Sequence, residues 1–367
     1  SRGLGDVYKR QAMMRLSRYI FYTVFTAIFM VLCVIVGLDS AAAIIDETGA
    51  IQGNYHFGDV LIFVVTKLPS TVYEYIPFSS LIGCLYGLGL LAGTSELTVM
   101  RASGVSLLRI VYFVMKPVVL FIIFAVFIGE YFAPYLDQRA DGTREYLRKG
   151  SSSQDSATGL WIKEDREFMH FNAVFPGGVL YGVTRYQFSE DQELREASFS
   201  TRATHNAVEG FWMEENVSIT HFSGSNISTE KKLTRQWNSE LSPQILTVNV
   251  LPADSLPIST LVSHIKFLEQ QFMDSAVYKL AFWKKMLQPL VIISLVLVAI
   301  SFVFGPLRES TMGFRIFIGV IIGISFKMIQ DLLGPFSIVF GFPVLYAVTI
   351  PIFLCIITGL FLLKRSG

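Results

Sequence analysis

Hydrophobic and polar positions follow two different patterns along this chain. Long uncharged apolar runs occupy both ends, and a polar block with alternating apolar residues occupies the middle. A helix rises 1.5 Å per residue, so about 20 apolar residues cover the roughly 30 Å hydrocarbon core of a bilayer. The pattern predicts six transmembrane helices, at about 19–38, 60–92, 107–132, 277–304, 314–333 and 338–363.

The polar block, at about residues 151–262, predicts a β domain. Apolar and polar residues alternate in short segments that turn residues such as Ser189–Gln192 separate. This alternation is typical of strands, here expected at 160–163, 167–171, 179–188, 197–203 and 211–220. Several short strands at such spacing favour an antiparallel sandwich or jelly roll. We therefore expect an α+β integral membrane protein, with three helices, a β-jelly-roll domain and three further helices.

The same pattern divides the chain into four parts. Residues 1–13 have no apolar period and are expected to lie outside the fold. Helices one to three occupy 14–135, with a short helix at about 94–104; the β domain occupies 136–262, and helices four to six occupy 263–367. Gly334-Pro335 predicts the turn between the last two helices.

Basic residues predict the orientation in the membrane. Arg15 and Arg18 precede the first helix, whereas Asp39–Asp59 after it contains no Lys or Arg. Because short cytoplasmic loops carry an excess of Lys and Arg, both termini are expected in the cytoplasm and the β domain outside.

Composition agrees with a membrane protein. Of the 367 residues, 52% are hydrophobic and 16% charged, whereas about a quarter of the residues of soluble domains are charged. The net charge of +1 gives no indication of nucleic-acid binding.

Cys33, Cys84 and Cys355 all lie in apolar runs and are expected to be small buried residues. The five histidines have no metal-ligand spacing.

A short amphipathic segment, Gly93–Gly104, separates the second and third helices. Thr94 or Ser95 can cap a helix there, with Glu96 in the first turn. The helix is too short to span a membrane, so it is expected at the surface. Four of its side chains are then available to a partner: Glu96, Leu97, Met100 and Arg101. A simple connecting turn is the alternative.

The second helix combines breaks with small residues. Pro69 and Pro77 interrupt it, and Gly83, Gly87, Gly89 and Gly93 form two small-xxx-small faces. Such faces allow helices to approach closely in lipid. The partner is either another subunit or another helix of the same chain.

Basic residues also gather near the expected outer face. Arg139, Arg144, Arg148 and Lys149 follow the third helix, and Lys284 and Lys285 lie near the start of the fourth. They are able to meet an anionic ligand, or to form an ordinary solvated surface. Within the fifth helix, Lys327 and Asp331 are spaced to pair on one face.

The chain contains no Gly-x-x-x-x-Gly-Lys-[Ser/Thr] phosphate loop and no catalytic triad spacing. It is therefore not expected to be the ATPase of a transporter, and it shows no constellation of paired acids, histidine or nucleophile for another enzyme activity. Three classes stay open: a transporter permease, a membrane enzyme acting on lipids, and a membrane-anchored scaffold or lipid-handling protein without an ATPase partner.

Several motifs narrow this choice in combination. They are Ser95–Gly104 after the second helix, Glu130–Pro134 after the third, Gly159–Trp161 at the start of the β domain and Phe304–Arg308 after the fourth helix. With the arrangement of helices they resemble the LptF/LptG lipopolysaccharide export permeases of Gram-negative bacteria. Gln288-Pro289 and Met312–Arg315 are more similar to the LptG branch of that family.

The resemblance implies a location and partners. It implies a multi-pass inner-membrane subunit of the lipopolysaccharide exporter, needed for outer-membrane biogenesis. The implied partners are an LptF-like permease, an LptB-like ATPase dimer that carries ATP and magnesium, and an LptC-like bitopic periplasmic protein. This chain would hold no cofactor, and its β domain would pass the lipid towards a periplasmic bridge.

The resemblance also implies roles for individual residues. The segment after the second helix matches the family's coupling helix, through Glu96, Leu97, Val99, Met100 and Arg101. Lipid A phosphates need cations at the outer rim, for which the candidates are Arg139, Arg144, Lys284 and Lys285. Acyl chains need an apolar cavity, for which the candidates are Phe25, Phe29, Phe63, Phe78 and Tyr86. One departure is clear: Ala41–Glu47 stands where the family carries lysines, so the basic exit of the third helix is expected to take more of the phosphate contact.

Overall fold

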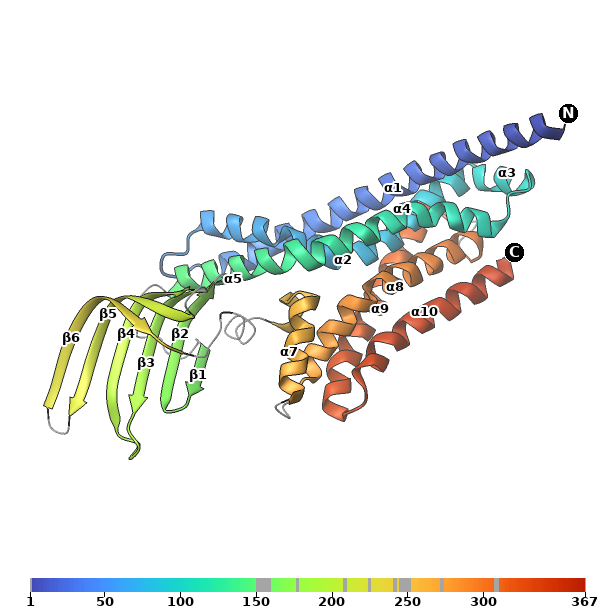
Figure 1. The fold of residues 1–367 in the computed structure, drawn as a ribbon. Coiled ribbons are helices and arrows are strands. Elements are labelled where there is room, and N and C mark those ends of the chain that lie inside the picture. The colour runs from blue at the N-terminus through green and yellow to red at the C-terminus, as the bar shows by residue number, and fades with distance from the viewer. Residues whose placement is uncertain are drawn as a thin grey trace. The chain divides into compact units, whose positions relative to one another are not determined.

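A computed structural model gives the fold as two compact units (Figure 1). It describes residues 2–149, 160–175, 178–206, 210–223, 226–239, 243, 252–270, 274–306 and 310–366. The helical unit contains Ser1–Ser40, Leu68–Phe132 and Pro257–Gly367, and the β unit contains Ala41–Lys67 and Ala133–Leu256. The β unit thus includes the ends of the first two long helices as well as the sheet. Gly159, Leu307 and Arg308 of the motifs above lie outside the described residues.

Six of the described helices are long and apolar enough to cross a membrane, as the sequence predicts. They are α1 (Arg2–Thr48), α2 (Phe57–Gly93), α4 (Leu107–Phe127), α8 (Ala276–Phe304), α9 (Met312–Phe340) and α10 (Val344–Ser366). A π-turn, η1 (Ile128–Phe132), joins α4 to α5 (Ala133–Lys149). Shorter helices among the described residues include α3 (Glu96–Ala102), η2 (Ala253–Ser255) and the amphipathic α7 (Ile258–Gln270). Because α1 begins at Arg2, the chain is already helical in the first 13 residues, and their place outside the fold stays a prediction.

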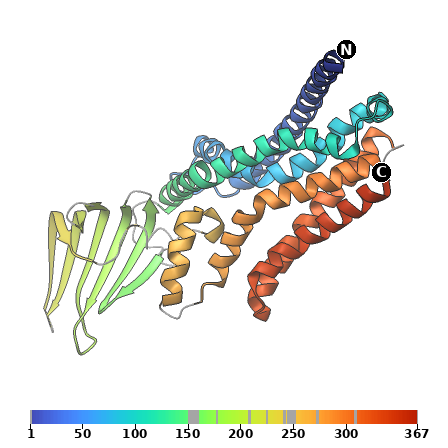
Figure 2. The ribbon, with the colours of Figure 1, turned by 45° about the vertical axis from the view of Figure 1, so that its right-hand side comes forward.

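The core of the helical unit lies around α2 and α8, which are the most buried of the six long helices, whereas α1 and α9 are the most exposed. Helix α10 packs along α8, as Figures 1 and 2 show. Cys84 and Cys355 are buried as expected, but Cys33 lies on the exposed side of α1.

The glycines of α2 explain how closely the helices approach. A Cβ atom on Gly83 would lie 2.5 Å from the Cα atom of Ile28 in α1, and one on Gly87 would lie 3.1 Å from the Cβ atom of Ala27. A Cβ atom does not fit at Gly83, and at Gly87 it would fit only if the neighbouring atoms moved. These glycines therefore serve packing within the chain, which is one of the two interpretations that the sequence left open.

The predicted turn at Gly334-Pro335 is wrong. Helix α9 continues through both residues to Phe340. A proline removes only one N–H group, and a membrane helix tolerates that loss where neighbouring groups compensate for it. The helix ends instead at Gly341, whose φ of 70° is the left-handed conformation that commonly terminates helices.

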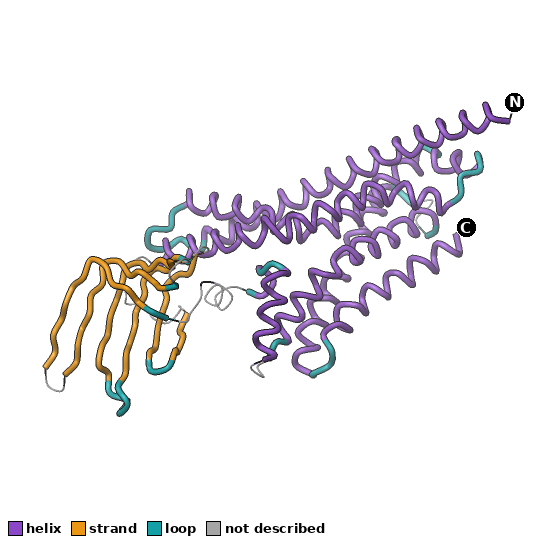
Figure 3. Tube along the Cα trace, viewed as in Figure 1, coloured by secondary structure: helices purple, strands orange, loops and turns teal. Residues whose placement is uncertain are grey.

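The described residues of the β unit form one antiparallel sheet of six strands in sequence order (Figure 3). The strands are β1 (Leu160–Glu164), β2 (Glu167–Phe175), β3 (Val179–Phe188), β4 (Leu194–Asn206), β5 (Phe211–Ser223) and β6 (Asn226–Trp237). In the sequence the sheet falls between the third and fourth long helices, as predicted, and the five expected strands are present. Strand β6 was not predicted, because polar residues and an exposed Leu233 hide its alternation. One face carries an apolar core that includes Met169, Phe171, Val183, Trp212 and Trp237.

Candidate functional site

The predicted surface helix is present as α3, which has seven residues. Its predicted cap is wrong: neither Ser95 nor Thr94 caps it as expected. Ser95 has a φ of 59° and makes no side-chain cap hydrogen bond, because a capping residue needs an extended backbone. The hydroxyl of Thr94 instead donates to Oε1 of Glu96 at 2.9 Å. The turn out of α2 thereby holds Glu96 at the start of α3.

The two faces of α3 differ. Leu97 and Met100 share one face, as predicted, but that face is turned inwards and belongs to the core of the helical unit. Val99 points outwards and is 66% exposed. Thr98 and Arg101 line a hollow with Val303 and Phe304 at the end of α8. Another protein would therefore meet Val99 and the rim of this hollow, while Leu97 and Met100 connect α3 to the core.

Arg315, the last residue of the Met312–Arg315 motif, ties α9 to α2. Arg315 lies in the first turn of α9 with 3% of its surface exposed, and the sequence assigned no contact to it. Its Nη1 atom donates to the carbonyl oxygen of Gly89 at 2.8 Å. A Cβ atom on Gly89 would lie 3.0 Å from the same nitrogen, so glycine leaves the room that the guanidinium uses. The contact lies near the end of α2 that leads into α3.

A charged cluster lies within the long helices. Lys327 of α9 pairs with Glu74 of α2 and lies 4.0 Å from Asp331 on its own helix. The predicted pair of Lys327 and Asp331 is confirmed. Glu74, its partner across the helix interface, could not be deduced from spacing because it is 253 residues away.

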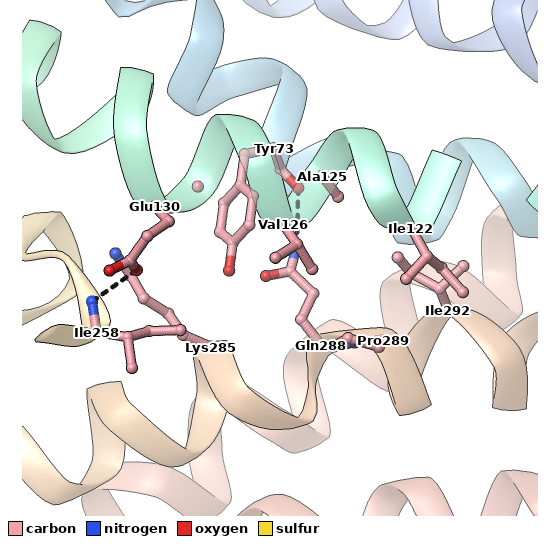
Figure 4. Close-up of a pocket in the computed structure, with 11 residues that line it drawn as sticks. Tyr73, Ile122, Ala125, Val126, Glu130, Ile258, Lys285, Gln288, Pro289 and Ile292 are labelled. Carbon is pink, nitrogen blue, oxygen red and sulfur yellow. Dashed lines mark hydrogen bonds between the residues drawn. The ribbon is translucent and has the colours of Figure 1, made fainter. Parts of the chain in front are cut away.

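A small pocket lies among α2, α4, η1, α7 and α8 (Figure 4). On one side, Nε2 of Gln288 donates to the carbonyl oxygen of Tyr73 at 2.9 Å. Pro77 stands four residues after Tyr73 and has no N–H to donate, so Gln288 replaces the hydrogen bond that the proline removes. A Cβ atom on Gly129 would lie 2.3 Å from the ring of Tyr73, so the π-turn needs glycine at this point.

On the other side of the pocket, Glu130 caps helix α7. Its carboxylate accepts hydrogen bonds from the backbone N–H groups of Ile258 at 2.9 Å and Ser259 at 3.3 Å. A carboxylate at a helix N-terminus is stabilised by unpaired N–H groups and by the helix dipole. Figure 4 shows that the side chain of Lys285 extends towards Glu130. Lys285 is thus next to an acid of its own chain.

The four predicted outer cations are divided between the units. Arg139 and Arg144 belong to the β unit, and Lys284 and Lys285 to the helical unit. Arg139 is exposed and Lys284 is half-buried. Arg144 forms an ion pair with Glu47. Their contact with phosphates stays a prediction.

The aromatic residues predicted for an apolar cavity are also divided. Phe25 stacks on Phe29 with ring centroids 6.4 Å apart and contacts Phe121 at 5.3 Å. Phe78 and Tyr86 also lie in the helical unit, but Phe63 lies in the β unit beneath Arg144. None of the five lines the pocket of Figure 4. A cavity for acyl chains formed by these residues stays a prediction.

Comparison with known proteins settles the family. The family model described as "Lipopolysaccharide export system permease LptF/LptG" matches residues 18–365. The chain is 32% identical over 354 residues to "Lipopolysaccharide export system permease protein LptG" of Escherichia coli (strain K12), covering 96% of this chain and 98% of that protein. It is 31% identical over 352 residues to the protein of the same name from Haemophilus influenzae, with 96% and 98% covered. With six membrane-spanning helices and a sheet between the third and the fourth, the chain belongs to the LptF/LptG family of lipopolysaccharide export permeases.

Proposed function

We propose that this chain is the permease subunit of an ATP-driven exporter that extracts lipopolysaccharide from the inner membrane and passes it through its periplasmic domain to a transport bridge. The observation that carries the proposal is the family match over residues 18–365, on a chain with six membrane-spanning helices. The sequence has no phosphate loop, so a separate subunit must hydrolyse ATP. In this proposal both termini are cytoplasmic and the sheet is periplasmic.

The proposed partners are an LptB-like ATPase dimer, an LptF-like second permease and an LptC-like periplasmic protein. Helix α3 is the proposed contact with the ATPase, since it lies between two membrane helices and exposes Val99. Glu96, Leu97, Met100 and Arg101 complete the proposed coupling site.

Packing suggests how a movement of α3 reaches the membrane helices. Leu97 and Met100 are buried in the same core as residues of α2, α4 and α8. A displacement of α3 must therefore move these helices or break the contact, because packed interiors deform little. The bond of Arg315 to Gly89 extends this connection to α9.

Lipopolysaccharide offers two chemistries for the chain to recognise. Its phosphates suit the guanidinium and ammonium groups of Arg139, Arg144, Lys284 and Lys285. Its acyl chains suit the aromatic residues of the long helices, Phe25, Phe29, Phe63, Phe78 and Tyr86.

Affinity purification of the tagged full-length chain from its own membranes tests this proposal. We expect an ATP-binding protein to co-purify, and lipopolysaccharide to stimulate or inhibit its ATPase activity. Val99→Asp places a charge on the exposed apolar side chain and is expected to lower the yield of that protein at least about tenfold. Thr229→Asp on strand β6 is the matched control and should leave the yield unchanged. A chain that purifies without any ATPase would support the scaffold alternative instead.

A further inference from the structure

The guanidinium of Arg144 is already occupied by an acid of the same chain. Its Nε atom donates to Oε1 of Glu47, which lies 97 residues away in sequence. The side chains of Arg144 and Glu47 are only 28% and 12% exposed. Ion pairs so shielded from water are harder to separate than those on an open surface. Any other anion that binds Arg144 must compete with this carboxylate.

A second ion pair of the same kind lies beside the first. Lys67 of α2 pairs with Asp141 of α5 at 2.8 Å. The ring of Phe63 lies 5.4 Å from the Arg144 guanidinium and 4.9 Å from the Lys67 ammonium, so one aromatic ring contacts both cations. Each of these two basic residues therefore has its own carboxylate.

The backbone keeps Glu47 in place. The loop that follows α1 returns to α5, where the N–H group of Asn54 donates to the carbonyl oxygen of Leu147 at 3.1 Å. Tyr55 of the same loop is 1% exposed. Burial, and then the neighbouring carboxylate of Glu47, raise the pKa of Tyr55 to about 12. A carboxylate held in this way has a high effective concentration at Arg144.

We propose that Glu47 is an internal competitor for the lipid phosphate, holding the Arg144 guanidinium until a phosphate of lipopolysaccharide displaces it. The inference rests on the proposed phosphate contact of Arg144. A phosphate, like a carboxylate, presents two oxygens to the arginine fork, so one can replace the other without moving the arginine far. The exchange weakens phosphate binding, which suits a site that must release its ligand. It also breaks a link between the end of α1 and α5.

The test compares three single substitutions in the purified full-length exporter complex. Glu47→Gln removes the charge but keeps the size of the side chain. Asp46→Asn makes the same change of charge at the neighbouring exposed residue and is the matched control. Arg144→Gln removes the proposed phosphate contact. The probe is bisphosphorylated lipid A in detergent, with dephosphorylated lipid A as the reference ligand, and each variant's melting temperature is measured first.

We expect Glu47→Gln to bind bisphosphorylated lipid A about 3- to 10-fold more tightly, the range of a partly shielded ion pair. Asp46→Asn should bind like the original protein, Arg144→Gln more weakly, and the double variant Glu47→Gln/Arg144→Gln like Arg144→Gln alone. Dephosphorylated lipid A should not distinguish Glu47→Gln from the original protein. If Glu47→Gln fails to fold, Glu47→Asp keeps the charge on a shorter side chain and should show a smaller gain.

Three other outcomes overturn the inference and can be told apart. If Arg144→Gln weakens binding but Glu47→Gln does not strengthen it, Glu47 is a structural partner and the phosphate contact stands. If Arg144→Gln leaves binding unchanged, the phosphate contact itself is wrong. An equal gain with Asp46→Asn would show a general effect of charge and would also contradict the inference.

Discussion

The helical unit and the β unit bury polar groups in different ways. In α8 and α9, the buried hydroxyls of Ser294, Ser301 and Ser337 donate to carbonyl oxygens of their own helices at 2.7 to 2.8 Å. The buried Arg315 of the helical unit likewise bonds a backbone carbonyl oxygen, whereas the β unit buries a network of opposite charges. Arg185 of β3 pairs with Glu167 and, at 3.0 Å, with Glu214, whose side chain is completely buried.

In the proposed topology, this difference follows from what surrounds each unit, which is lipid for the long helices and water for the sheet. Helices in lipid gain little from burying apolar surface against each other, so close contact between them decides their stability. Small residues such as Gly83 and Gly87 provide that contact. A sheet in water is stabilised by burial of its apolar face and is therefore able to tolerate a buried ion network. Such a network costs desolvation energy when it forms, but removing only one partner is strongly destabilising because it leaves a buried charge without its counter-charge. Close packing of small residues should therefore matter most for the stability of the helical unit, and the buried ion network for the stability of the β unit.

The largest expected effect is that of Gly83→Leu. The side chain would overlap the backbone of α1, since even a Cβ atom would lie 2.5 Å from the Cα atom of Ile28. We expect the folded protein to be lost from detergent extracts, as measured by fluorescence-detected size-exclusion chromatography. Gly37→Leu is the control, because a Cβ atom there meets nothing within 4 Å. Equal loss in both variants would show that close packing does not distinguish the two sites.

Arg185→Met tests whether the buried ion network stabilises the β unit. It leaves Glu214 buried without its cation and should lower the free energy of unfolding by about 3–5 kcal/mol. Arg202→Met is the control, since Arg202 is 41% exposed and lies 4.0 Å from Glu215; an exposed pair contributes about 0–1 kcal/mol. Chemical denaturation followed by tryptophan fluorescence measures both. Similar losses would contradict the importance of the buried network.

Gln288→Leu should have a moderate effect in the helical unit. It leaves the carbonyl oxygen of Tyr73 without the donor that compensates for Pro77, which costs about 1–3 kcal/mol for a buried acceptor. Thermal unfolding in detergent measures the loss, and Met286→Leu on the exposed side of α8 is the control. Adding Pro77→Ala to Gln288→Leu returns the missing N–H group. If the double variant regains most of the lost stability, Gln288 compensates for Pro77 as inferred. No restoration would mean that Gln288 acts in another way.

The smallest expected effect is a dependence on pH. Burial raises the pKa of Glu214 above its ordinary value, although Arg185 opposes this shift. The stabilisation that comes from the protonated form is complete below the ordinary pKa of the carboxyl, and it is lost as the pH rises through the raised value. The melting temperature of the original protein minus that of Glu214→Gln should therefore be greater at pH 5 than at pH 7.5. A difference that is independent of pH would contradict the raised pKa.

Much of the fold could be predicted because it depends on local patterns. Apolar runs of bilayer length marked the six helices, and alternation marked five strands. Strand β6 was missed because it is largely exposed, so that no apolar face shows in its sequence. The end of α9 was misplaced because Pro335 was given more weight than Gly341.

The contacts that join the helices around the candidate site could not be predicted, since each depends on a partner far away in sequence. Gln288 and Tyr73 are 215 residues apart, and Arg315 and Gly89 are 226 apart. Their spacing carries no periodic signal. The pairing of Arg144 with Glu47 joins two positions that the sequence did single out, one as basic and the other as a departure from the family, but only the fold brings them together.

The most direct test of the proposed function is ATP-driven release of lipopolysaccharide by the reconstituted exporter with Glu96→Lys in this chain. The account predicts that release is lost, while the ATPase subunit still binds ATP and this chain still folds. Glu230→Lys, at an exposed acid of strand β6, should release lipopolysaccharide like the original complex. Unchanged release and unchanged ATPase activity with Glu96→Lys would contradict the assignment of α3 as the coupling helix.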